Sequence, residues 1–213
     1  MPPTNRRGPG KRLLLILAAL ASVVAGYYLG QYLQRRPLAE LTAVVYPAGQ
    51  RIDYPAELGI DNDPGVDTPW RLFLAADTDV PACSRLLRHY ATVINRLAAW
   101  PQIQARLRLT VLAYDRPDAA AVRAFTGGAS WAEVLSAQTQ SLDYLSGQLG
   151  ILPDPGNWCT ETQANAVLVA PDRTSWALIP HEQAAMMAHN IRTIIAFVED
   201  PDGYPIELIG KKH

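Results

Sequence analysis

From residue 70 onward, short apolar runs alternate with longer segments in which apolar positions recur every three or four residues. Three runs have the length of strands: residues 70–75 (WRLFLA), 107–115 (LRLTVLAYD) and 165–171 (NAVLVAP). The turn residues PDRT separate the third run from SWALIP, so this pair predicts a β-hairpin. Residues 34–69 are rich in Pro, Gly and Asp, and there only 41–52 suits a short strand or hairpin.

Two segments have the clear apolar spacing of amphipathic helices. The first, residues 83–100, carries apolar side chains on one face, at Leu86, Leu87, Tyr90, Val93, Ile94 and Leu97. Pro101 ends this helix or begins the next connection. The second, residues 182–198, has its apolar positions at Ala184, Met187, Ala188, Ile191, Ile194, Ile195 and Val198. Each pattern predicts a helix with one buried face.

Two further helices are predicted between the second and third runs. A short one covers 118–125, with Pro117 just inside it and Asp115 near its cap position. A longer one begins at Ser130, where the spacing from Ser130 to Glu133 resembles a capping box. Gly150 is its expected stop.

The resulting order is β-α-β-α-(α)-β-β-α. Helices between the first strands imply right-handed crossovers and parallel pairing, and the late hairpin adds an antiparallel edge. We therefore predict an α/β fold: a thioredoxin-like mixed sheet with helices on both faces, preceded by one transmembrane helix. The expected divisions are a cytoplasmic N-terminus at 1–12, an anchor at 13–33, a linker and N-terminal extension at 34–69, the thioredoxin-like domain at 70–200 and a tail at 201–213.

The anchor is predicted from residues 13–33, which contain 21 residues and no charge. Four Lys and Arg residues precede this run and two follow it, which favours a cytoplasmic N-terminus and a domain on the periplasmic side of the inner membrane. The alternative is a cleaved signal peptide, because small residues at 19–22 offer a cleavage site. In both cases the domain lies outside the cytoplasm.

Charge excludes one class of partner. The chain has 19 Lys and Arg and 20 Asp and Glu, but residues 1–36 hold 6 of the basic residues and none of the acidic ones. The remaining 13 basic residues against 20 acidic ones leave residues 37–213 with a formal charge of −7. Nucleic-acid binding needs clustered Lys and Arg, so we expect no nucleic-acid partner.

The candidate chemistry is centred on two cysteines. Cys83 opens the first long helix, where the helix dipole favours a thiolate, and Cys159 lies in the loop before the third strand. In a thioredoxin-like sheet that loop returns over the helix. Three interpretations stay open: a structural or labile disulfide, two independent thiols that pack as small apolar groups, and a redox or metal pair. No catalytic triad, paired-carboxylate site or phosphate-binding glycine loop is present in the sequence.

Three segments resemble the Sco/SenC family, which are membrane-anchored thioredoxin-fold copper chaperones of cytochrome c oxidase assembly. They are TPWRLFLAADTDVPACSRLL, LAYDRPDAAAVRAF and AVLVAPDRT. The family segments they resemble are W-x-L-x-F-x-G-[YF]-T-x-C-P-x-x-C-P, a strand ending in S-x-D-P-x-x-D, and D-H-S followed by a strand and D-P-D-G. The resemblance covers residues 41–198. It lies in the order and placing of the segments, whereas the residues at the family's functional positions differ.

The family's copper ligands are two cysteines and one histidine, and the resemblance implies that only one of the three survives here. Val80 stands where the first cysteine would be, Cys83 matches the second after a one-residue deletion, and Thr162 replaces the histidine. The chain thus resembles a degenerate member of the family.

Cu(I) is the one cofactor that the remaining thiols would suit, because soft sulfur ligands select it. Cys83 and Cys159 would need a third ligand, for which the candidates are His181, His189, Met186 and Met187. His181 is expected to begin the last helix, so that it shares a face with His189 two turns later. Met187 fits the apolar face of this helix, and His89 is expected on the solvated side of the first long helix.

The leading functional hypothesis is a membrane-anchored, periplasm-facing Sco-like protein that acts in respiratory oxidase assembly without the intact copper site. Its partner would be an oxidase subunit or assembly factor, and it would act by binding rather than by catalytic turnover. The second hypothesis is a thiol-disulfide oxidoreductase that uses Cys83 and Cys159, although the paired C-x-x-C of such enzymes is absent. The third is a docking module without catalysis.

Overall fold

The computed structural model describes residues 9–39, 41–62, 65, 67–160 and 163–199. Within residues 9–13 and 30–39 it describes the backbone only. The chain divides into two units, and Leu41–Glu199 is the unit that contains the sheet. The helix α1, Pro9–Ala39, belongs to the other unit and includes the predicted anchor segment 13–33. Among the described residues, no helix combines the length and the apolar character that crossing a membrane requires.

The sheet has six strands in the order β1-β6-β5-β2-β3-β4. Parallel pairing joins β2 to β3 and β3 to β4, while β2–β5, β5–β6 and β6–β1 are antiparallel. The strands are β1 Val44–Arg51, β2 Trp70–Ala76, β3 Leu107–Ala113, β4 Ala132–Leu135, β5 Ala166–Val169 and β6 Thr174–Ile179. The β5–β6 pair is the predicted hairpin, but it does not form the expected edge of the sheet, because β1 pairs with the outer side of β6.

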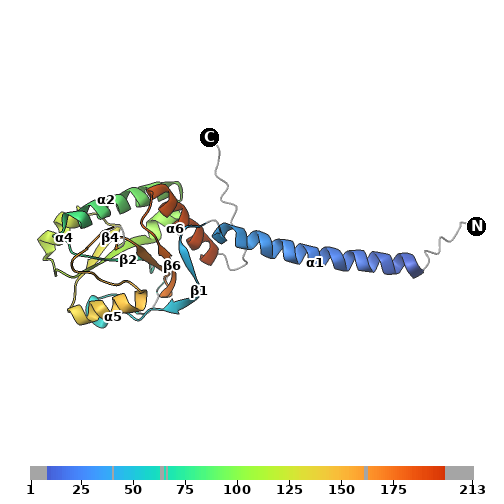
Figure 1. The fold of residues 1–213 in the computed structure, drawn as a ribbon, viewed down its shortest axis with the longest axis horizontal. Coiled ribbons are helices and arrows are strands. Elements are labelled where there is room, and N and C mark those ends of the chain that lie inside the picture. Colours follow the sequence, from blue (N-terminus) through green and yellow to red (C-terminus); the bar gives the residue numbers. More distant parts are fainter. Residues whose placement is uncertain (1–8, 40, 63–64, 66, 161–162, 200–213) are drawn as a thin grey trace, which may run out of the picture. The chain divides into compact units, whose positions relative to one another are not determined.

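Helices cover both faces of this sheet. Figure 1 shows α2 and α6 on one face and α5 on the other. The helices of this unit are α2 Pro81–Arg96, α3 Pro101–Arg106, α4 Ala119–Thr126, α5 Thr139–Leu149 and α6 Ala184–Glu199, with short 3₁₀ helices at Ala56–Leu58 and Leu97–Ala99. The thioredoxin-like mixed sheet with helices on both faces is therefore confirmed.

The core is built where the sequence is most apolar. In β2 and β3 every residue is buried except Arg71 and Arg108, as expected for central strands covered on both faces. The apolar stripe of α2 packs inward through Leu86, Leu87, Tyr90, Val93 and Ile94. Gly150 closes α5 with a φ of 70°, so the predicted helix stop is confirmed at a position where glycine avoids the Cβ clash.

The prediction of one long helix that begins at Ser130 is wrong for the first turns of that helix. Residues 132–135 form the edge strand β4, and Glu133 pairs with Arg71 of β2 instead of closing a capping box. The reason is pairing, because β3 has an open edge whose backbone groups need partners. Leu109 of β3 donates its N–H to the Trp131 carbonyl oxygen at 2.8 Å, and β4 continues that ladder.

One smaller expectation is confirmed and another differs from the structure. The short strand expected within residues 41–52 is β1, which pairs with β6. The cap of α4 is Asp118, whose Oδ1 accepts from the N–H groups of Ala120 and Ala121 at 2.9 and 2.8 Å. Asp115, the expected cap, accepts instead from the Thr78 hydroxyl.

Candidate functional site

Cys83 lies in the first turn of α2, after the carboxyl end of β2. Pro81 begins the helix, where its missing N–H leaves no hydrogen bond unmade. Val80 is the N-cap residue and supplies no side-chain cap, and its carbonyl oxygen accepts from the Cys83 N–H at 2.9 Å. The helix dipole therefore places partial positive charge beside the Cys83 sulfur, which favours a thiolate when this cysteine is reduced.

Cys83 and Cys159 form a disulfide that spans 76 residues, with their Cα atoms 5.0 Å apart. Cys83 is 1% exposed and Cys159 is 9% exposed. The structure thus holds the two cysteines as a bonded pair rather than as independent thiols. Because both residues are enclosed, an external thiol has little access to either sulfur atom.

The backbone around Cys159 is unusual. Its φ is 58°, in the left-handed region, which costs a residue with a side chain on the order of 1 kcal/mol. Turn hydrogen bonds surround it: the Asn157 N–H donates to the Asp154 carbonyl oxygen at 2.9 Å, and Thr160 donates to Asn157 at 3.2 Å. The disulfide therefore holds a conformation that Cys159 alone disfavours.

Two tyrosines contact the loop that contains Cys159 and hold it against the rest of the domain. The Tyr90 hydroxyl of α2 donates to the Ala164 carbonyl oxygen at 3.0 Å, in a fully buried position, and burial raises the pKa of Tyr90. The Tyr114 ring, just after β3, lies 5.2 Å from that of Trp158 between centroids. Loop and helix are thus held by the disulfide, one buried hydrogen bond and one ring contact.

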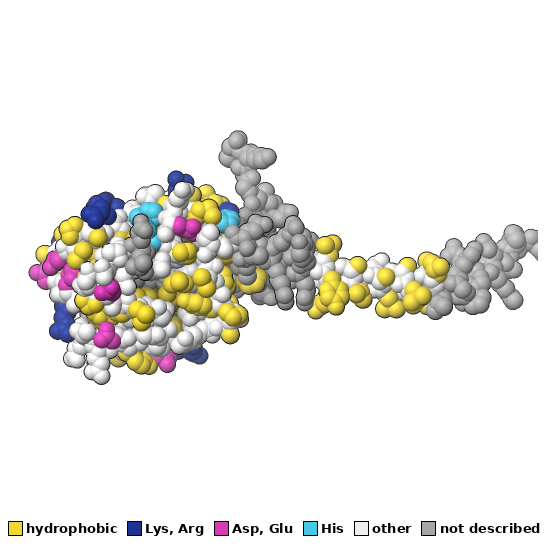
Figure 2. All heavy atoms as spheres, in the orientation of Figure 1, with side chains coloured by type: hydrophobic (Ala, Val, Ile, Leu, Met, Phe, Trp, Pro, Cys, Tyr) yellow, Lys and Arg dark blue, Asp and Glu magenta, His cyan; other side chains and the backbone are white. Residues whose placement is uncertain are grey.

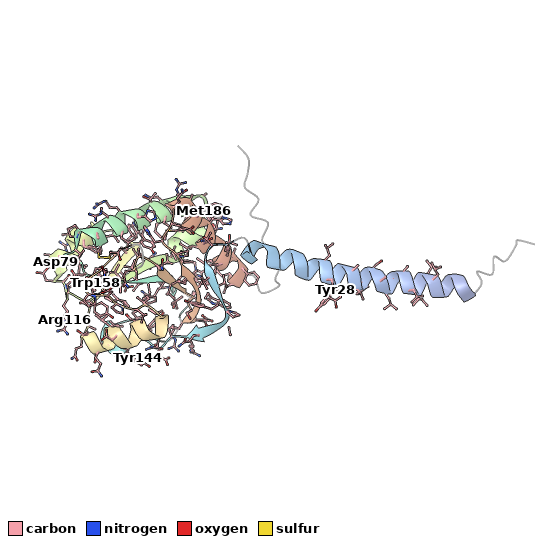
Figure 3. All side chains as sticks on the ribbon, in the orientation of Figure 1. Tyr28, Asp79, Arg116, Tyr144, Trp158 and Met186 are labelled. Atoms are coloured by element: carbon pink, nitrogen blue, oxygen red, sulfur yellow. A yellow bond between two sulfur atoms is a disulfide. The ribbon has the colours of Figure 1, made fainter. Side chains whose placement is uncertain are left out.

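Tyr114 connects this loop to α5. Its hydroxyl donates to Asp143 at 3.1 Å and lies 2.9 Å from the Ser146 hydroxyl. Burial, and to a smaller extent the Asp143 carboxylate, raise the pKa of Tyr114 to about 12. Figure 3 labels Trp158, Asp79 and Arg116 at this end of the domain.

Three carboxylates lie in the loops at the same edge of the sheet. Asp77, Asp79 and Asp115 have ligand oxygens within 4.8 Å of one another. Thr78, which is buried, donates its hydroxyl to Asp115 and ties the two loops together. Negative charge in the loop before α2 works against a Cys83 thiolate, in opposition to the helix dipole.

The structure does not arrange the predicted metal ligands as one set. Val80 offers only an alkyl side chain, and Thr162 lies outside the described residues. The expectation that His181 begins the last helix is wrong, because α6 begins at Ala184. His181 and His189 therefore do not share a helical face, and His189 Nδ1 lies 3.1 Å from the Arg192 guanidinium.

Met186 is also separate from the cysteines. It lies on α6 and is 37% exposed (Figure 3), whereas the disulfide is enclosed. A copper ion held as in the Sco family needs thiolates, and a disulfide supplies none. The oxidised pair in this structure therefore does not fit that ion.

Sequence reasoning missed His89. It lies on the half-buried side of α2, not on the solvated side, and its ring faces the segment that leads into α6. No local pattern signals this, because its contacts are with residues more than 90 positions later in the chain.

No family model matches the sequence, and no curated protein matches it. Similar solved structures include copper-bound ScoI from Bradyrhizobium japonicum, at 14% identity and a TM-score of 0.44, over 58% of this chain and 83% of that one. Apo Sco1 from Thermus thermophilus has 14% identity and a TM-score of 0.47, over 73% and 95%. A thiol:disulfide interchange protein from Bacteroides sp. has 14% identity and a TM-score of 0.43, over 76% and 94%. The structural neighbours of this thioredoxin-like domain therefore include Sco proteins, and the likeness is one of fold.

Proposed function

We propose that this chain is a membrane-anchored, periplasm-facing Sco-like protein that acts in the assembly of a respiratory cytochrome oxidase by binding a partner. The observation that carries the proposal is the place of the disulfide. Cys83 stands at the N-terminus of the helix that follows the first core strand, and Cys159 precedes the strand β5. This is the edge of the sheet where thioredoxin-like folds place their chemistry, and the motifs around it resemble those of Sco proteins.

Burial of the bond favours binding over turnover. An oxidoreductase must expose one sulfur to an incoming thiolate, and here neither cysteine is more than 9% exposed. In the reduced protein the two thiols could hold Cu(I) through sulfur, but Val80 offers no donor atom. We therefore expect weak copper binding at the cysteines and none while they are bonded.

The anchor is supported by the character of α1. The described side chains from Leu14 to Leu29 are all exposed, and none of them is charged. Exposed apolar surface of this kind is stable in lipid or against a partner. Basic residues flank the segment, with more on its N-terminal side, which supports a cytoplasmic N-terminus and a periplasmic domain.

The alternative is a thiol-disulfide oxidoreductase that opens the Cys83–Cys159 bond. The left-handed backbone of Cys159 favours this alternative, because reduction would let the residue leave a disfavoured conformation. The two functions differ in what the bond does. In the first it shapes a binding surface, and in the second it is exchanged in every cycle.

The test combines a deletion strain with two complementing genes. Loss of the gene should lower the amount of assembled oxidase in membranes, measured by haem spectra and oxygen uptake. The wild-type gene should restore it, and so should a Cys83→Ala/Cys159→Ala variant if the chain acts by binding and still folds. Normal oxidase without the gene would overturn the assembly role. Failure of the variant at normal protein level, together with insulin reduction by the wild type, would favour the oxidoreductase.

A further inference from the structure

A cavity lies at the end of the sheet opposite the disulfide. Its volume is about 330 Å³, at the lower end of the roughly 300–1,000 Å³ that small-molecule sites occupy. Pro69 and Arg71 line it at the amino end of β2, whereas Cys83 follows the carboxyl end of that strand. The cavity is therefore separate from the two cysteines, and the function proposed above does not use it.

Hydrogen bonds hold the walls of this cavity in one conformation. Asn62 closes the loop that carries Tyr54: its Oδ1 accepts from the Tyr54 N–H at 3.0 Å, and its Nδ2 donates to the Tyr54 carbonyl oxygen at 2.8 Å. Arg173, from the turn between β5 and β6, donates to the same Asn62 oxygen at 2.7 Å. On the other side, Thr68 Oγ1 accepts from the Gly65 N–H at 2.9 Å. A ligand would thus meet a preformed site, and little free energy would be lost in ordering it.

Arg71 supplies a fixed cation in the wall of the cavity. Its side chain is 13% exposed, and its Nη1 group donates to Thr110 at 3.1 Å and to the Glu133 carboxylate. These two bonds fix the guanidinium plane. The Nε and Nη2 atoms of Arg71 have no hydrogen-bond partner among the described residues and stay accessible at the cavity wall. The guanidinium therefore keeps an open edge of N–H donors for a ligand.

The Tyr54 hydroxyl is a second donor in the same wall. Tyr54 lines the cavity and is 6% exposed. Burial raises the pKa of Tyr54 to about 12, so the phenol keeps its proton at neutral pH. Among the charged groups, the Arg71 and Arg173 guanidiniums affect this pKa most, and both lower it. A carboxylate is the group that accepts from a phenol and an arginine edge together, because both hydrogen bonds are then charge-assisted.

The rim of the cavity carries the opposite charge. Asp61 and Asp67 line it, and both residues are exposed. Over the face of the domain in Figure 2, acidic and basic side chains are instead scattered among hydrophobic ones. Two carboxylates at the mouth favour a cationic group there. The rest of the lining includes the apolar residues Ile60, Pro69 and Ala170. A ligand that suits all three parts has a carboxylate, an ammonium group and a small apolar body.

We propose that this cavity binds a free α-amino acid with an aliphatic side chain. The carboxylate of the ligand accepts from the open edge of Arg71 and from the Tyr54 hydroxyl. Its ammonium group faces the acidic rim, and its side chain lies against the apolar lining. A simple anion meets the two rim carboxylates and a simple cation meets Arg71, so the site discriminates against both in favour of the zwitterion. Binding involves no covalent step.

The test is isothermal titration calorimetry of the full chain in detergent with three ligands of similar shape. L-Leucine carries both charges, isocaproate lacks the ammonium group, and L-leucinamide has a neutral amide in place of the carboxylate. We expect saturable binding of one leucine per chain. Each analogue should bind at least about tenfold more weakly, because it loses the interactions of one charged group.

Two variants, each titrated with all three ligands, separate a lost contact from a damaged fold. Tyr54→Phe keeps the ring, whose centroid lies 5.9 Å from that of Phe73, and removes only the hydroxyl donor. It should weaken leucine and isocaproate about tenfold, and leucinamide less, because the amide is uncharged. Asp67→Asn should weaken leucine and leucinamide but not isocaproate. Tyr144→Phe changes an exposed tyrosine of α5 and is the matched control, which should bind all three ligands as the wild type does.

Three results would overturn the proposal. They are no binding of leucine to the wild-type chain, binding of either analogue as tightly as leucine, and unchanged leucine affinity in Tyr54→Phe or in Asp67→Asn. None of them depends on whether the chain serves an oxidase, because the titration measures binding to the purified chain with its cysteines bonded.

Discussion

Removing the disulfide should destabilise the domain by a predictable amount. The bond joins residues 76 positions apart, and the chain-entropy model gives about 4.5 kcal/mol for a loop of this length at 25 °C. The variant's native state recovers part of this, because Cys159 is held at a φ of 58° and its release relieves on the order of 1 kcal/mol. For the Cys83→Ala/Cys159→Ala variant we therefore expect the free energy of unfolding to fall by roughly 2–4 kcal/mol.

The assay is equilibrium urea unfolding of the full chain in detergent, followed by circular dichroism and tryptophan fluorescence. Trp158, next to Cys159, is one of the chain's 5 Trp residues, so the fluorescence includes a signal from the loop. Alanine is preferred to serine because Cys83 is 1% exposed, and a hydroxyl there would be buried without an assured partner. With reductant present throughout, wild type and variant should agree within about 1 kcal/mol, which isolates the bond from the loss of sulfur packing.

Two results would refute this reasoning. Equal stability of the oxidised wild type and the variant would mean that the bond does not constrain the unfolded chain. Rapid alkylation of the untreated wild type after unfolding would mean that the bond is not formed. The expected thiol count is none before reduction and two after it.

Three further predictions concern other parts of the chain. Tyr90→Phe removes the donor to the buried Ala164 carbonyl oxygen, so the free energy of unfolding should fall by about 1–3 kcal/mol in the same urea assay. Burial raises the pKa of Tyr114 from its ordinary 10.0 to about 12 in the folded chain, so its contribution to the free energy of unfolding is full below pH 10 and is lost as the pH rises toward 12. Tyr114→Phe should make the decline of stability over this range shallower, and an unchanged slope would contradict the raised pKa. A reporter fused to the C-terminus should be active only outside the cytoplasm and remain with membranes after a salt wash, whereas cytoplasmic activity would contradict the anchor.

The sequence alone determined the elements whose burial is complete or strictly periodic. The runs that became β2 and β3 are apolar enough to predict central strands, and the turn residues between β5 and β6 predict their hairpin. The stripe of α2 predicts its buried face residue by residue. The local pattern of apolar residues is enough to predict these elements, because each must bury a continuous apolar face whichever element it packs against.

Other features were decided only by tertiary structure, because their partners are distant in the chain. Residues 132–135 have no strong pattern and became a strand because β3 offered an open edge. The disulfide joins positions 76 apart, and the contact of His89 with Met187 spans 98. A local pattern reports which face of an element is apolar, but it carries no information on which polar or sulfur atom the opposite element presents. The packing of α6 against α2 supplies that information, and it places a histidine expected in solvent against the Glu182 carbonyl oxygen and the Met187 sulfur.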